Sequence, residues 1–150
     1  MSLPALRHFA DEAECKQYFI ENYCNAEIST HDGITVSFHA DMFEHAFYIR
    51  AQKKWKSQKD HFSVDRGERI DWIKYVLNDP TIIPRQGYDK ARKRSDNSRR
   101  VAFLTPNNYV VIIQLLGKKK ARFVTAYLVD GPDVANKINS SPVWDSADWL

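Results

Sequence analysis

The sequence predicts an α+β fold in which N-terminal helices pack on a four-stranded antiparallel meander sheet. Three segments of the first 80 residues have apolar residues at helical spacing, whereas from Thr81 onward apolar residues alternate with period two between turns that contain Pro, Gly or Asn. Helices followed by strands, without regular alternation, indicate an α+β class. A chain of 150 residues is the usual size of one domain. We therefore expect residues 1–150 to form a single domain, with residues 1–30 as an added N-terminal helical segment.

Three segments have the apolar periodicity of helices. Residues 11–23 carry acids in the first turn, where they complement the helix dipole. Residues 41–51 can form a short helix capped by Asp41. The strongest signal covers residues 66–78, where Asp65 and Glu68 have capping-box spacing and Pro80 follows the end. The expected buried residues of these helices are Cys15, Phe19, Tyr23, Phe43, Ala46, Phe47, Ile70, Ile73 and Leu77.

Strands are expected once before the third helix and repeatedly after it. Residues 34–38 alternate apolar and polar side chains after a His-Asp-Gly turn. Segments near 88–94, 99–104, 109–116 and 121–129 are separated by turn residues and predict the meander. In the last segment, period two places Phe123, Thr125 and Tyr127 on one face. Val124, Ala126 and Leu128 then form its core face, and Trp144 is expected to pack back on the domain.

The charge of the chain is distributed unevenly. The net charge is only +3, yet residues 85–122 hold eleven basic residues against two acidic ones, whereas residues 1–27 have a net charge of −3. A second run, Lys53-Lys54-Trp55-Lys56, interleaves an aromatic residue with cations. Basic segments of this kind suit a phosphate backbone, although a solvated surface explains the second run as well. The residues expected to contact substrate are Lys90, Arg92, Lys93, Arg94, Lys118, Lys120 and Tyr127.

Several other classes of protein find no support in the sequence. No apolar run approaches the length of a membrane span, and no apolar leader follows a basic N-terminus. Cys15 and Cys24 fit no metal or redox spacing and are expected to be free thiols. His39 and His45 lack an evident third metal ligand, and no Gly-rich phosphate loop or nucleophile elbow occurs. We expect a cytoplasmic protein with no metal, no cofactor and no membrane partner.

Two arginines on the third predicted helix are candidates for binding an anion. Arg66 and Arg69 fall on the same stripe as the apolar residues, which would place cations in the first turn. There they would oppose the helix dipole by ~0.3–1 kcal/mol each, and a bound anion would reverse that penalty. Pairing with a neighbouring acid such as Asp65 is the structural alternative.

His45 and Thr125 are the other catalytic candidates. His45 lies on the short helix beside the apolar stripe, and imidazole is the side chain that titrates near neutral pH. Metal-independent RNA cleavage requires proton-transfer groups and cations around a crowded phosphate. A satisfied core histidine is the structural alternative for His45. Thr125 and Tyr127 could line a cleft with their hydroxyl groups, although both are also ordinary strand residues.

The order of these features resembles a known family. The segments are FEHAF, RGERIDWIKYVLNDP, the Arg-rich YDKARKRSDNSRRV, NYVVIIQLL, KARFVTAYLVD and KINSSPVW. Together they are similar to the phage-type branch of the barnase/EndoU/colicin/RelE ribonuclease superfamily, over about residues 32–144. The resemblance implies helices packed on a four-stranded antiparallel sheet and RNA cleavage that leaves a 2′,3′-cyclic phosphate. It also implies a basic or His residue on an early helix, an Arg on the next and a Ser or Thr on a late strand, matched here by His45, Arg66 or Arg69, and Thr125.

The expected function is therefore a metal-independent endoribonuclease of toxin or phage type. Its partners would be RNA and an inhibitory protein of the immunity or antitoxin kind. No general base is assigned by the sequence; Glu44 and Glu68 are the carboxylates considered. Two alternatives stay open, because a shared fold does not guarantee chemistry. One is a non-catalytic RNA-binding module of the same fold, and the other is an interaction domain that binds an acidic partner protein.

Overall fold

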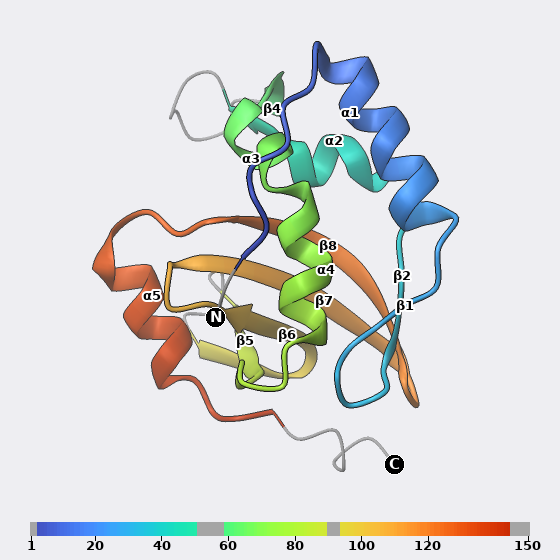
Figure 1. The fold of residues 1–150 in the computed structure, drawn as a ribbon. Helices are drawn as coiled ribbons and strands as arrows, with labels where there is room; N and C mark the ends of the chain where they lie inside the picture. The colour runs from blue at the N-terminus through green and yellow to red at the C-terminus, as the bar shows by residue number, and fades with distance from the viewer. Residues whose placement is uncertain (1–2, 51–58, 90–93, 145–150) are drawn as a thin grey trace.

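The computed structural model describes residues 3–50, 59–89 and 94–144. The basic run at 53–56 and three expected substrate contacts, Lys90, Arg92 and Lys93, lie outside these residues. The described chain forms an α+β fold with a mixed six-stranded sheet (Figure 1). None of the helices in the described ranges has the length and hydropathy of a membrane span.

The main sheet has the strand order β1-β2-β8-β7-β6-β5. Its last four strands form an antiparallel meander, as expected, although the first expected strand, near 88–94, shares only Tyr88 and Asp89 with β5. Two short strands extend the sheet, and β2 runs parallel to β8. The prediction of a four-stranded antiparallel sheet was therefore wrong in strand number and in type. The parallel pairing joins residues more than 80 positions apart, which local periodicity cannot reveal. The strands are β1 (Ile28–Ser29), β2 (Thr35–Ser37), β5 (Arg85–Asp89), β6 (Arg94–Leu104), β7 (Tyr109–Gly117) and β8 (Lys120–Leu128).

The helices precede the meander except for one at the C-terminal side. Asp11 caps α1 (Glu12–Phe19) by accepting a hydrogen bond from the Glu14 amide, and a π-helical turn, η1 (Ile20–Cys24), continues it. The short helix is α2 (Met42–Phe47), followed by the separate hairpin of β3 (Tyr48–Arg50) and β4 (Lys59–Phe62). The helix α5 (Gly131–Ser140) was not expected, because Gly131 and Pro132 belong to the Gly and Pro residues after Thr81 that were expected only to form turns. Proline is common both in turns and at the start of a helix, so Pro132 fits either structure.

The predicted helix over residues 66–78 is two helices. α3 (Val64–Glu68) begins at the cap Ser63, and α4 (Ile70–Asn78) begins after a break at Arg69. The capping box at Asp65 was therefore assigned two residues too late. Gly67 allows α3 to pack closely on the Phe62 ring, because a Cβ at this position would lie 2.8 Å from Cζ of that ring. The end at Asn78 is confirmed.

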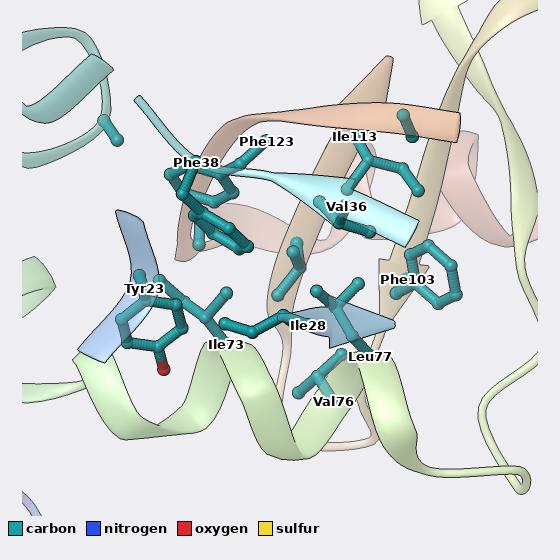
Figure 2. Close-up of a cluster of buried hydrophobic side chains, with 14 of the residues drawn as sticks. Tyr23, Ile28, Val36, Phe38, Ile73, Val76, Leu77, Phe103, Ile113 and Phe123 are labelled. Atoms are coloured by element: carbon teal, nitrogen blue, oxygen red, sulfur yellow. The ribbon is translucent and has the colours of Figure 1, made fainter. Parts of the chain in front are cut away.

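The sheet separates two clusters of buried apolar side chains. On its first face, α4 packs through Ile73 and Leu77 on side chains of β2, β6, β7 and β8, as Figure 2 shows. On its second face, α5 packs through Ala135 and Ile138 on Ala102 and Val110. The buried residues expected for the helices and Trp144 are confirmed.

A β-bulge changes the faces of β8. Ile113 pairs with Phe123, and Ile112 pairs with Thr125, so that Val124 has no partner of its own. Phe123 therefore belongs to the first face, whereas Thr125 lies opposite Ile112 on the second. The prediction that Phe123, Thr125 and Tyr127 share one face was wrong for Phe123, because a single extra residue reverses the alternation.

Candidate phosphate-binding cleft

A cavity of about 360 Å³ opens on the second face of the sheet beside α5. We call it the Arg66 cleft. Its charged lining residues among those described are three cations and one carboxylate, whereas much of the remaining wall is apolar. A cleft with excess positive charge is suited to an anion such as a phosphate group. The lining residues are Arg66, Arg100, Ala102, Ile112, Tyr127, Leu128, Asp130, Val134, Lys137 and Ile138.

Arg66 is held in the cleft by three contacts. Its backbone amide donates to the Ser63 hydroxyl at 3.3 Å, and its Nη1 donates to the carbonyl oxygen of Ala46 at 3.1 Å. Its Cζ lies 5.1 Å from the centroid of the Tyr127 ring. The cation–π contact and the carbonyl partner engage only part of the guanidinium, and within the described residues no hydrogen bond joins its other donors to a carboxylate. Arg66 is thus a fixed cation whose other donors can serve an anion.

Burial and neighbouring groups act on the pKa values of Arg66 and Tyr127. Burial lowers the pKa of Arg66, while Tyr127, Tyr109 and Asp130 oppose that shift electrostatically. Burial raises the pKa of the Tyr127 phenol, and Arg66 and Arg100 oppose it. Both shifts reflect a partly desolvated environment, in which charge interactions are stronger than in water. An anion in this cleft would therefore gain more from Arg66 than from an exposed arginine.

Basic residues continue from the cleft across the sheet. Arg100 on β6 pairs with Gln114 on β7, which pairs with Arg122 on β8, so the three lie in one row. The Arg122 guanidinium donates to the Gln114 Oε1 through Nε at 3.1 Å and Nη2 at 2.8 Å. Gln114 shares its face of β7 with the cleft residue Ile112. The row therefore extends the positive surface of the cleft over the second face.

Arg69 has a different environment from Arg66. Its Nη1 donates to the backbone carbonyl of Asp65 at 2.8 Å, and its Cζ lies 5.1 Å from the Trp72 ring centroid. It does not belong to the cleft lining described above. The break between α3 and α4 separates the two arginines: Arg66 is the third residue of α3, with its amide bonded to the cap Ser63, whereas Arg69 lies at the break itself. The expectation of two cations in a first turn was wrong for this reason.

Thr125 and His45 do not line the cleft. Thr125 lies on β8, which supplies the lining residue Tyr127, and His45 lies on α2, which is hydrogen-bonded to Arg66. Thr125 is half-buried on the cleft face of β8, and its Oγ1 is buried without a hydrogen-bond partner among the described residues. His45 is exposed on α2, directly before Ala46, whose carbonyl accepts from Arg66. The interpretation of His45 as a buried core residue is therefore wrong, and its part in catalysis stays a prediction.

The other expected contacts are distributed as follows. Tyr127 lines the cleft, whereas Lys118 and Lys120 are exposed at the turn between β7 and β8. Lys120 shares its face of β8 with Arg122, because the two residues are two positions apart along one strand. Arg94 begins β6. The expected basic surface is thus represented by two places in the described chain, the cleft and the β7–β8 turn.

Three of the charged cleft residues were not predicted from the sequence. Arg100 was counted in the basic segment but not selected, and Asp130 and Lys137 were not considered. Arg100 could have been found from the strand pattern, since it alternates with the core residue Val101. Asp130 and Lys137 depend on α5, which turns back over the sheet. Asp130 is an exposed carboxylate that lines the cleft. A carboxylate can serve as a general base, a role for which the sequence alone assigned no residue.

The chain is an α+β fold with a cleft on the second face of its sheet, and the charged lining residues of this cleft are three cations and one carboxylate among those described. Comparisons with protein-family models, with curated proteins and with solved structures gave no match.

Proposed function

We propose that the chain is a metal-independent endoribonuclease of toxin or phage type, acting at the Arg66 cleft. The observation that carries the proposal is the gathering of Arg66, Arg100 and Lys137 with Asp130 and Tyr127 around one cavity. Fixed cations of this kind stabilise the charge that develops on a phosphate during transesterification. The meander β5–β8, with helices before it, supports membership of the phage-type branch of the barnase/EndoU/colicin/RelE superfamily.

The chemistry that we propose needs two proton transfers. Asp130 accepts the proton of the ribose 2′-OH while the 2′-oxygen forms a bond to phosphorus. The bond from phosphorus to the 5′-oxygen breaks, and a protonated group returns a proton to that oxygen. Lys137 in the cleft and His45 on α2 are the candidates for this acid. Arg66 and Arg100 neutralise the phosphate oxygens, and the products are a 2′,3′-cyclic phosphate and a free 5′-hydroxyl.

The proposal is tested with end-labelled single-stranded RNA in EDTA. We expect the wild-type protein to cleave it and leave cyclic-phosphate ends, and Arg100→Ala to lower kcat/KM by roughly 10²-fold through loss of transition-state charge stabilisation. Lys74→Ala is the matched control, since Lys74 is an exposed cation on α4, the helix on the other face. Loss of wild-type cleavage in chelator, restored by added metal, would overturn the mechanism.

A non-catalytic RNA-binding module is the second candidate. Its support is that His45, the expected proton-transfer group, lies outside the cleft lining. Among the described lining residues, Asp130 is then the carboxylate that can take a proton, and it is exposed. Such a module would bind RNA without cleaving it, with a salt dependence of about 0.7 in log K per phosphate contact for a single strand. A salt-titrated binding assay on the preparation used for cleavage therefore distinguishes the two functions.

A further inference from the structure

The Arg66 cleft has an apolar wall that phosphate binding alone does not require. Leu128 at the end of β8 and Val134 on α5 are 38% and 40% exposed at this site. Ile112 and Ile138 continue the wall inward, next to the Tyr127 ring. A site that only follows a sugar–phosphate backbone uses cations and hydrogen-bond donors. Exposed apolar side chains beside cations instead offer a surface for the flat face of a base.

The dimensions of the cleft agree with a ligand of limited size. Its volume of about 360 Å³ falls in the range of sites that enclose small molecules, which runs from about 300 to 1,000 Å³. A base can enter such a site only when it is unpaired and unstacked, because a duplex keeps its bases in its interior. The geometry therefore favours a single-stranded ligand.

The row of basic residues gives the rest of the strand a path. Arg100 belongs both to the cleft and to the row with Gln114 and Arg122. Arg122 is oriented by its two hydrogen bonds to Gln114 and is exposed. Beyond it, Lys120 lies on the same face of β8. A chain of phosphates that leaves the cleft at Arg100 would thus meet further cations on the sheet.

We propose that the Arg66 cleft receives one unstacked nucleotide of a single-stranded RNA. Its base packs against Leu128 and Val134, its phosphate lies between Arg66 and Arg100, and the strand continues past Arg122. The inference rests on the proposed function and names the substrate class of the same site.

The test measures binding by fluorescence anisotropy with three uncleavable probes. They are an unstructured 2′-O-methyl RNA, a duplex with the same total number of nucleotides, and a strand of equal length that lacks bases. We expect the unstructured RNA to bind at least about 5-fold more tightly than the abasic strand, because its base covers the apolar side chains of Leu128 and Val134. It should also bind more tightly than the duplex.

Variants locate the effect in the cleft. The double variant Leu128→Ala/Val134→Ala should bring the ratio between unstructured RNA and abasic strand close to one. Val143→Ala is the matched control, since Val143 is an exposed valine, at 53%, outside the cleft lining. Melting temperatures of all variants show whether each is folded. A folded double variant that keeps the full ratio overturns the placement of the base.

The outcomes also separate this inference from the proposed function. Equal binding of the abasic strand, together with cleavage of native RNA, overturns the base site and leaves the ribonuclease intact. Base-dependent binding without cleavage of native RNA supports the base site and overturns the ribonuclease. Equal binding of the duplex overturns the single-strand preference. Failure of every probe to bind overturns the base site, and cleavage of native RNA then decides the ribonuclease by itself.

Discussion

The guanidinium of Arg66 lies over the ring of Tyr127, with its Cζ 5.1 Å from the ring centroid. This contact joins α3 to β8, and the hydrogen bond from Arg66 Nη1 to the Ala46 carbonyl, at 3.1 Å, adds α2. Three elements that are distant in the sequence therefore position one cation at the cleft. The planar guanidinium is needed for this arrangement, because it stacks and donates at the same time.

Arg66→Lys is expected to lower kcat/KM for RNA cleavage by roughly 10²- to 10³-fold, since lysine keeps the charge but loses the fork of donors. Arg7→Lys is the control, because Arg7 is an exposed arginine in an ion pair with Asp71, 2.8 Å away. Tyr127→Phe keeps the ring under the guanidinium and should retain most of the activity. Wild-type activity in Arg66→Lys would show that the geometry of this cation is not used.

The start of α3 depends on Ser63 rather than on Asp65. The buried Ser63 hydroxyl accepts from the Arg66 amide at 3.3 Å, whereas Asp65 is exposed. We expect Ser63→Ala to lower the free energy of unfolding by about 1 kcal/mol, as the loss of an N-cap usually does. Asp65→Ala should change it by less than about 0.5 kcal/mol. Urea denaturation of both variants measures the difference, and the reverse order would restore the capping box at Asp65.

His45→Gln separates a catalytic from a purely structural role with little interference from folding. Because His45 is exposed, the free energy of unfolding should change by less than about 0.5 kcal/mol. If His45 returns the proton to the leaving oxygen, cleavage should fall by ~10²–10⁴-fold. Melting temperature and cleavage rate are measured on one preparation. A stable variant with full activity would remove His45 from the mechanism and leave Lys137 as the acid.

The buried thiol of Cys15 predicts a loss of stability in alkali. Burial raises its pKa to about 12, whereas a thiol in an unfolded chain titrates near ~8.5. Above that lower value the unfolded chain binds fewer protons than the folded one, so the free energy of unfolding falls as pH rises toward the folded pKa, by up to ~1.4 kcal/mol per pH unit. The contribution of this thiol is fully present below pH ~8.5.

Denaturation of wild type and Cys15→Ala between about pH 7.5 and 10.5 isolates this effect. The variant loses some packing at every pH, but its stability should decline less steeply above pH ~8.5. Cys24→Ala serves as the control for removal of a thiol, since Cys24 is only half-buried. Parallel curves for wild type and Cys15→Ala would show that Cys15 ionises as easily in the folded protein as in the unfolded one.

Local patterns predicted the elements whose partners are near in the chain. The acids in the first turn and the four-residue spacing of Cys15, Phe19 and Tyr23 predicted α1 and its buried side. Turn residues between alternating segments predicted the β5–β8 meander, because each strand pairs with the next one. The same reasoning found Arg66 and Tyr127, which now line one cleft. It could not separate Arg66 from Arg69, because the break between α3 and α4 is not marked by any helix-ending residue other than Gly67.

By itself, the sequence determined the α+β class, the antiparallel meander, the buried sides of the helices and the concentration of positive charge. Tertiary structure alone decided that β2 adds in parallel to β8, that the bulge at Val124 turns Thr125 away from Phe123, and that α5 brings Asp130 and Lys137 to Arg66. The physical reason is distance along the chain. Periodicity and turn chemistry act between neighbours, whereas a cleft forms where segments far apart in sequence bury their apolar sides against one sheet.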